Sequence, residues 1–291
     1  MRTIGVIGVG SMGRPIALNL IKAGYTVSVC DIRDEALALF RGDGVTAVTQ
    51  ARDLAACDMV IVMVGNDADV RDVTVGPGGL IEAIDPAKAP LVSIMSSVLP
   101  RTVTDAAAAL GAKNAIVVDA PVSGGPVRAA EAAISIMAAG SDEVFARIEP
   151  VYAALGRPIF RCGPVGSAAG VKIVNNILGV ANMLLMNEAV HLAATVGIDL
   201  PFQLGVMEAS SGRTWATSNF DGYRSLMHAN SDDPDVTHRL LAILRKDLKL
   251  ATTLSKEVQV TTPVLDAVSK ATDALDGGDL NARWQALWRD R

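Results

Sequence analysis

The chain has 291 residues, half of them apolar and a fifth charged, and its formal net charge is −5. This balance is typical of a folded globular protein, and the length favours two domains over one. An acidic chain without a basic run is a poor candidate for a nucleic-acid or membrane-surface partner, so we expect neither.

The cysteine and hydropathy patterns argue against a disulfide-bonded, metal-binding, secreted or membrane protein. Cys30, Cys57 and Cys162 form no CxxC pair, and the histidines have no ligand spacing, so we expect no disulfide and no metal. The chain opens on a strand-like run rather than on a secretory signal. The apolar stretch beyond Asn176 is interrupted by polar residues such as Glu188, which favours a buried helix over a membrane span. We therefore expect a cytoplasmic protein.

Residues 1–162 alternate short apolar runs with helical periods. The runs show no polar alternation, as expected of strands that are buried on both faces. Predicted strands cover residues 3–10, 25–32, 58–66, 89–97, 115–123 and 134–140. Predicted helices cover residues 14–24, 34–44, 101–112 and 141–156. This βαβα order predicts an α/β Rossmann-type fold with a doubly wound parallel sheet.

Residues 163–291 form an all-α C-terminal domain in this interpretation, because helical periodicity dominates after Cys162. The stretch from Ala168 to about Val196 predicts a long central helix of roughly 28 residues. Apolar residues occur on every face of that helix, so we expect it to be buried all round, in part against a second subunit. The expected assembly is a homodimer or a homotetramer built from dimers.

A glycine-rich turn follows the first predicted strand and opens the first predicted helix. Gly8, Gly10 and Gly13 have the GxGxxG spacing. This spacing allows a tight turn, a close approach of the backbone to a pyrophosphate, and packing of the helix on the strand. The N–H groups at the helix start attract phosphates. In this context the motif predicts a dinucleotide-binding site, and the alternative is a plain glycine turn.

Asp31 ends the second predicted strand, about 20 residues beyond the glycine loop. A carboxylate at this place accepts a hydrogen bond from the ribose 2′-OH of NAD and repels the 2′-phosphate of NADP. NAD is therefore the expected cofactor, and NADP is the less favoured one. Arg33, two residues further on, softens that discrimination. The alternative role for Asp31 is that of a helix-capping aspartate.

The stretch GPVGSAAGVKIVNN places Lys172 near the start of the long predicted helix. Asn175 and Asn176 follow three and four residues later, so both share a helix face with the lysine. Small residues before Lys172 leave room for a ligand. One interpretation is a proton-transferring amine with an amide beside it. The other is a lysine whose ammonium group reaches solvent from a helix start.

Four blocks of the sequence resemble the β-hydroxyacid dehydrogenase family (3-hydroxyisobutyrate dehydrogenase-like). They are GVIGVGSMGRPIALNLIKAGYTVSVCDI, DAPVSGGPVRAAEAAISIMAAG, GPVGSAAGVKIVNN and KDLKLA, in the family's order over nearly the whole chain. The resemblance implies an NAD(P)-dependent 3-hydroxyacid dehydrogenase or semialdehyde reductase that acts on a small anionic substrate. Residues 1–162 are then the NAD-binding domain, and residues 163–291 are the substrate and dimerisation domain.

The resemblance also implies roles for individual residues. Lys172 matches the family's catalytic lysine, and Asn176 matches the amide that orients the substrate. Ser123, Gly124 and Gly125 match the loop that holds the substrate carboxylate. With the residues proposed above, the predicted cofactor-binding set is Gly8, Gly10, Ser11, Met12, Gly13, Asp31, Ile32, Arg33, Val64, Gly65, Asn66, Ser96, Ser97 and Lys246.

The remaining candidate residues do not determine which substrate is bound. Arg128 follows the substrate loop and is a candidate partner for a second anionic group, the alternative being a solvated arginine; Arg213 is a weaker candidate. The family often has Pro where Gly65 stands and Gly where Ala132 stands. Residues 210–245, before Lys246, resemble the family poorly, and that region helps to close the substrate pocket in the family. Several small hydroxy acids therefore remain compatible with the sequence.

The implied chemistry needs a group that moves the proton of the substrate hydroxyl. A free lysine, with a pKa of about 10.4, is a poor base at neutral pH, but burial among apolar residues disfavours the ammonium form. We expect Lys172 to accept the proton as an amine during oxidation and to return it as an ammonium during reduction.

Two other functions stay open from the sequence. Imine reductases share the architecture but usually lack a lysine at the position of Lys172. A non-catalytic dinucleotide-binding sensor would keep the glycine loop, but it would have no reason to keep Lys172, Asn176 and Ser123 together.

Overall fold

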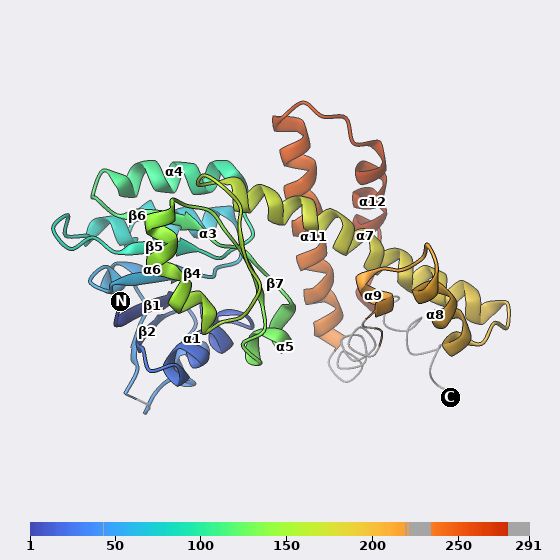
Figure 1. Cartoon of the computed structure of the whole chain (residues 1–291), viewed down its shortest axis with the longest axis horizontal. Coiled ribbons are helices and arrows are strands. Elements are labelled where there is room, and N and C mark those ends of the chain that lie inside the picture. The colour runs from blue at the N-terminus through green and yellow to red at the C-terminus, as the bar shows by residue number, and fades with distance from the viewer. Residues whose placement is uncertain (43, 219, 221–233, 279–291) are drawn as a thin grey trace. The chain divides into compact units, whose positions relative to one another are not determined.

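The computed structural model describes residues 1–42, 44–218, 220 and 234–278 (Figure 1). They fall into two compact units, Met1–Ile173 and Val174–Arg291. The two units meet inside the long helix α7 (Ser167–Thr195), so the first two turns of this helix belong to the N-terminal unit.

The N-terminal unit contains a six-stranded parallel sheet with the order β3-β2-β1-β4-β5-β6. Its strands are β1 (Thr3–Ile7), β2 (Thr26–Cys30), β3 (Thr46–Val48), β4 (Met59–Val62), β5 (Leu91–Ile94) and β6 (Ile116–Asp119). The chain builds outward from β1 to β3 and then returns to the other side of β1 with β4. The strand order therefore reverses between β1 and β4, which is the switch point where ligands bind in doubly wound sheets.

Both faces of this sheet are covered by helices, which confirms the Rossmann-type prediction (Figure 1). One face packs against α1 (Gly13–Lys22), α2 (Asp34–Ala38) and α6 (Asp142–Ala153). The other packs against α3 (Asp67–Val75), α4 (Pro100–Gly111) and the 3₁₀ turns η1 (Ala51–Leu54) and η2 (Leu80–Glu82). Successive β4 residues Ile61 and Val62 enter opposite cores and are fully buried, which explains why the strands show no polar alternation.

The predicted run 134–140 does not join the main sheet. Its strand β8 (Ser135–Ala138) lies in a three-stranded sheet between β7 (Val122–Ser123) and β9 (Ile159–Arg161). The intervening helix α5 (Gly125–Ala130) spans six residues, and β8 runs antiparallel to β7. So short a connection suits an antiparallel return, because a parallel crossover needs a dozen or more residues.

Local boundaries also differ from the predicted ones. Helix α2 ends at Ala38 rather than near residue 44, and Gly42 and Gly44 then adopt positive φ values of 106° and 71°. The strand β3 and the helix α3 were absent from the predicted elements. Both are short, so periodicity gives them little signal.

The described residues after Cys162 form helices, as predicted. These are α7, α8 (Leu200–Ala209), α9 (Trp215–Ser218), α11 (Pro234–Glu257) and α12 (Pro263–Asp273). The predicted long helix is confirmed, since α7 has 29 residues. In the single chain Val180 and Val190 are buried, whereas Leu178 and Leu192 are about two-thirds exposed, and the expected burial of the remaining face against a second subunit stays a prediction.

Ala132 ends the α5 segment in the left-handed region, with a φ of 53°. The N–H of Ala133 donates to the carbonyl of Arg128 at 2.8 Å, which closes the helix end around Ala132. Glycine is the usual residue at this position because a Cβ is unfavourable there.

We expect Ala132→Gly to raise the free energy of unfolding by about 1 kcal/mol, because it removes the left-handed strain of a Cβ-bearing residue. The control is Ala108→Gly in α4, an exposed helical position where glycine should cost about 1 kcal/mol. Urea unfolding of both variants measures the two effects. Destabilisation by both substitutions would contradict the assigned backbone geometry.

Candidate active site

The predicted cofactor and substrate residues of the N-terminal unit lie at one edge of the main sheet. The loops after β1, β2, β4, β5 and β6 all leave the sheet at its carboxyl ends, since the six strands are parallel. This edge carries the glycine loop, Asp31, residues 64–66, residues 96–97 and the segment 119–125. Parallel pairing therefore brings together segments that are far apart in the sequence.

The glycine loop has a conformation that requires two of its glycines. Gly8 has a φ of 83°, and a Cβ there would lie 2.3 Å from the carbonyl oxygen of Met63. A Cβ on Gly13 would lie 1.8 Å from the Gly8 oxygen. A Cβ on Gly10 would instead meet only the Arg33 side chain among the described residues, at 3.3 Å. Gly8 and Gly13 thus serve packing, and Gly10 leaves the loop backbone open on one side.

The start of α1 faces the same loop. No side chain caps its N-terminus, and no acidic residue lies in its first turn. The residues Ser11 and Met12 precede the helix, with Ser11 exposed and Met12 packed partly against the core. A helix start of this kind presents N–H groups and a positive dipole end to an anion.

Asp31 is 7% exposed and accepts hydrogen bonds on both carboxylate oxygens. The Val9 N–H donates to Oδ2 at 3.0 Å, and the Arg33 N–H donates to Oδ1 at 3.0 Å. The Arg33 guanidinium donates to both oxygens at 3.1 Å. Burial opposes ionisation, but the hydrogen bonds from Arg33 and Val9 outweigh it and hold the pKa of Asp31 below its ordinary value. The neighbouring Ile32 is 89% exposed.

The loops after β4 and β5 are tied together by Ser96. Its buried hydroxyl accepts from the Val64 N–H at 2.9 Å and donates to the Val64 carbonyl at 2.9 Å. Asn66 caps α3, because its Oδ1 accepts from the N–H groups of Ala68 and Asp69 at 2.8 and 3.1 Å. Ser96 and Asn66 thus stabilise the loops after β5 and β4. The predicted contacts of Gly65, Asn66, Ser96 and Ser97 with the cofactor stay predictions.

The Ser123-Gly124-Gly125 turn joins β7 to α5. Gly124 and Gly125 have φ values of 133° and 71°, so the turn needs glycine at both places. The Arg128 side chain packs against Gly124 and donates from Nε and Nη2 to the Ala133 carbonyl at 2.9 and 2.7 Å. Arg128 therefore braces this turn in the structure, and its predicted contact with substrate stays a prediction.

Asp119 anchors the start of α7. It is fully buried, its Oδ1 accepts from the Gly166 N–H at 2.8 Å, and its Oδ2 accepts from the Ala169 N–H at 2.8 Å. Burial raises the pKa of the Asp119 carboxyl against the opposing effect of these N–H groups. Lys172 lies three residues beyond Ala169 on the same helix and is 7% exposed. The carboxylate thus fixes the turn that precedes Lys172.

In the C-terminal unit, Asp247 links two predicted residues. The Asn176 Nδ2 donates to Asp247 Oδ2 at 2.8 Å, and the Lys246 Nζ donates to Asp247 Oδ1 at 2.7 Å. The Asp247 side chain is 11% exposed. The sequence interpretation used Lys246 and passed over its neighbour, although both stand in the block KDLKLA.

The remaining candidates contribute little to these clusters. Arg213 pairs with Glu208 at 2.8 Å and is mostly exposed. His228 and much of the segment 219–233 lie outside the described residues.

Within the described part of the chain, no group of histidine, cysteine or acidic side chains has the arrangement of a metal site. Among the described helices, α7 is long and apolar enough to span a membrane, a criterion that the core helix of a soluble protein also meets.

Known proteins match the chain along most of its length. Residues 3–163 match the family profile described as the NAD binding domain of 6-phosphogluconate dehydrogenase, and residues 166–285 match the profile for NAD-binding of NADP-dependent 3-hydroxyisobutyrate dehydrogenase. The 2-(hydroxymethyl)glutarate dehydrogenase of Eubacterium barkeri is 34% identical over 94% of this chain and 88% of its own. The NAD-dependent L-serine dehydrogenase of Pseudomonas aeruginosa is 32% identical over 91% and 89%.

Solved structures agree with the fold. The crystal structure of 3-hydroxyisobutyrate dehydrogenase from Salmonella typhimurium superposes with a TM-score of 0.80 at 28% identity, covering 97% of this chain and 99% of that one. An imine reductase from Myxococcus stipitatus has a TM-score of 0.61 at 18% identity, covering 98% and 99%, which shows a shared fold alone.

We expect Asp119→Ala to lower the free energy of unfolding by about 2–4 kcal/mol, because two buried N–H groups at the start of α7 lose their acceptor. The control is Asp142→Ala, which removes an exposed partner of Arg161 and should change stability by less than about 1 kcal/mol. Urea unfolding compares the two variants. Equal effects would contradict the anchoring role of Asp119.

Proposed function

The chain belongs to the β-hydroxyacid dehydrogenase family, and on that premise we propose that Lys172 is the acid–base group of an NAD-dependent oxidoreductase for a small β-hydroxy acid. The observation that carries this proposal is the burial of the Lys172 side chain directly after the turn that Asp119 anchors. A buried amine held on a fixed helix is suited to exchange a proton with one bound hydroxyl rather than with water.

The residues at the sheet edge fit a dinucleotide. The open side of Gly10 and the uncapped start of α1 suit the pyrophosphate, and Asp31 suits a ribose hydroxyl. A bound nicotinamide would supply the redox chemistry as the acceptor of a hydride, one proton with two electrons, from the carbinol carbon. NAD is the cofactor supported by the relatives, and NADP remains compatible with the family.

The substrate is proposed to bind as an anion. The Ser123 hydroxyl and the backbone of Gly124 and Gly125 form a turn with which a carboxylate can hydrogen-bond, and the Arg128 side chain lies beside Gly124 of that turn. Asn176 orients the substrate hydroxyl, and Asp247 fixes the plane of the Asn176 amide by accepting from its Nδ2. Lys172 then removes the hydroxyl proton during oxidation and returns it during reduction.

Substrate tests separate this function from the alternatives. We expect NADH formation with at least one small hydroxy acid from a panel containing 3-hydroxyisobutyrate, L-serine, L-threonate and 2-(hydroxymethyl)glutarate, the substrates named for relatives. Binding of NADH without turnover of any member would instead favour a dinucleotide sensor. Reduction of a cyclic imine in place of these substrates would favour an imine reductase.

We further propose a cytoplasmic homodimer. Three cysteines that stay unpaired in the structure suit a reducing compartment. The leucines Leu178, Leu185 and Leu192 recur every seven residues on α7 and are each more than half exposed in the single chain. A seven-residue apolar repeat on an exposed helix face is typical of a helix that packs on another helix.

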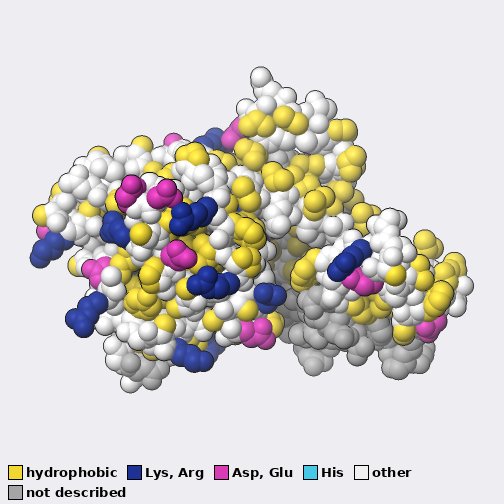
Figure 2. Space-filling model, viewed as in Figure 1, with side chains coloured by type: hydrophobic (Ala, Val, Ile, Leu, Met, Phe, Trp, Pro, Cys, Tyr) yellow, Lys and Arg dark blue, Asp and Glu magenta, His cyan; other side chains and the backbone are white. Residues whose placement is uncertain are grey.

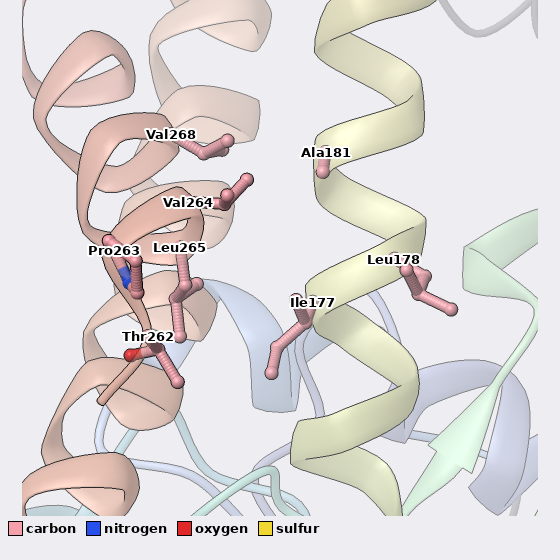
Figure 3. A pocket seen from close by; sticks show the side chains of 8 residues that line it. All are labelled: Ile177, Leu178, Ala181, Thr262, Pro263, Val264, Leu265 and Val268. Atoms are coloured by element: carbon pink, nitrogen blue, oxygen red, sulfur yellow. The ribbon is translucent and has the colours of Figure 1, made fainter. Parts of the chain in front are cut away.

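A groove beside this stripe extends the same apolar surface. Ile177 and Ala181 of α7 face α12 across it, and Pro263, Val264 and Val268 line the α12 side (Figure 3). Val264 is 75% exposed. Apolar side chains gather over α12 and the adjoining part of α7, with few charges among them (Figure 2). Pairing of two copies across a two-fold axis would cover this surface on both.

Lys172→Met should lower kcat by about 10²–10⁴-fold while the Kd for NADH stays within about twofold, because the variant keeps the side-chain volume and loses the proton-transfer group. The matched control is Lys88→Met at an exposed position, which should leave both quantities unchanged. Stopped-flow or steady-state kinetics and NADH titration measure them. A kcat above a tenth of the wild-type value would refute the acid–base role.

The double variant Leu185→Glu, Leu192→Glu should sediment at the 30.3 kDa mass of one chain, whereas the wild type should sediment at about twice that mass. Charged side chains on the stripe oppose burial between two copies. Leu39→Glu, a substitution at an exposed leucine of the N-terminal unit, is the control and should leave the dimer intact. A wild-type protein that sediments at 30.3 kDa would contradict the homodimer.

A further inference from the structure

The Asp31 carboxylate has no acceptor position to spare. Its two oxygens take four hydrogen bonds, from the Val9 N–H, the Arg33 N–H, and the Nε and Nη2 of Arg33, at 3.0–3.1 Å. An ionised carboxylate offers about four acceptor sites. A ribose hydroxyl that donates to Asp31 must therefore replace one of these donors.

Only one of the donor groups is free to leave. The N–H groups of Val9 and Arg33 belong to the backbone of the glycine loop and of the turn after β2. The Arg33 side chain, by contrast, is 58% exposed, although the Asp31 side chain with which it pairs is only 6% exposed. The guanidinium can therefore move into solvent without any change in the backbone, and a ribose hydroxyl that takes its place keeps the buried carboxylate hydrogen-bonded.

The guanidinium also borders the glycine loop. A Cβ placed on Gly10 would lie 3.3 Å from the Arg33 Nη2, so the cation lies next to the part of the loop backbone that is open to a dinucleotide. When the Arg33 guanidinium is displaced, it stays near the site, because Arg33 is only two residues from Asp31. A displaced guanidinium at that distance is placed to bind a phosphate on the ribose, with the bidentate geometry that arginine favours.

We propose that Arg33 is a specificity-determining residue that competes with the ribose hydroxyl of NAD for Asp31 and, once displaced, binds the 2′-phosphate of NADP. The inference rests on the proposed dinucleotide site. Arg33 thus weakens NAD binding and strengthens NADP binding. The preference for NAD over NADP is therefore smaller than Asp31 alone would produce. The exposed Ile32 between the two charged residues takes no part in this exchange.

Arg33→Ala tests the competition through binding rather than turnover. We expect the Kd for NADH to fall by about two- to fivefold, because the variant lacks the donor that competes with the ribose hydroxyl for Asp31. The Kd for NADPH should rise by at least about tenfold, because the charged partner of the phosphate is lost. Isothermal titration of the purified full-length chain measures both constants.

Arg41→Ala is the matched control. Arg41 pairs with Asp34 at the surface, so its removal changes the net charge equally and leaves Asp31 untouched. Loss of a positive charge alone weakens binding of an anionic dinucleotide, so tighter NADH binding by Arg33→Ala together with unchanged or weaker binding by Arg41→Ala supports the proposal.

The outcomes separate this inference from the proposed function. A wild type that binds and turns over NAD, with Arg33→Ala binding NADH no more tightly, overturns the competition and leaves the dehydrogenase function standing. An unchanged Kd for NADPH in Arg33→Ala overturns the assignment of the phosphate to Arg33. A wild type that binds neither NADH nor NADPH overturns both the inference and the dinucleotide site.

Discussion

The bonding of one buried carboxylate fixes the helix that carries the candidate catalytic lysine. Asp119 ends β6 and uses one oxygen for the Gly166 N–H and the other for the Ala169 N–H. Without this acceptor the start of α7 would hold unpaired N–H groups inside the protein, which is costly. The position of Lys172 relative to the edge of the sheet therefore depends on a residue that need not touch the substrate.

The sheet edge holds two aspartates whose surroundings push their pKa values in opposite directions. Asp119 is enclosed, and burial raises its pKa. Asp31 is also buried, but the hydrogen bonds from Arg33 and Val9 outweigh burial and keep its pKa low. Asp119 ends β6 and Asp31 directly follows β2, and each carboxylate accepts from an N–H group of a segment elsewhere in the chain. The same geometry thus serves as a structural anchor at Asp119 and as a proposed ligand site at Asp31.

Helix α7 combines requirements that explain its unusual composition. Its first two turns belong to the N-terminal unit, where Ala168 and Ala169 are fully buried in the apolar clusters of that unit. Further on, the helix buries Val180 and Val190 within its own chain and exposes leucines at seven-residue intervals. The leucine face is the one that the proposed dimer would cover. The sequence alone cannot distinguish a face buried within the chain from a face offered to a second copy.

Local pattern by itself determined the βαβα order, the glycine loop, the aspartate after β2, the long helix and the four-residue spacing of Lys172 and Asn176 along it, because each depends on spacing within a short segment. The family blocks also identified most of the candidate site residues. Only the tertiary structure decided that β8 lies outside the main sheet and that the Arg33 guanidinium hydrogen-bonds to Asp31. It also decided that Asp119 binds the backbone before Lys172 and that Asp247 accepts from the Asn176 amide. The last two contacts join residues 47 and 71 positions apart. Such contacts depend on how strands and helices pack, and the periodicity of the sequence does not predict them.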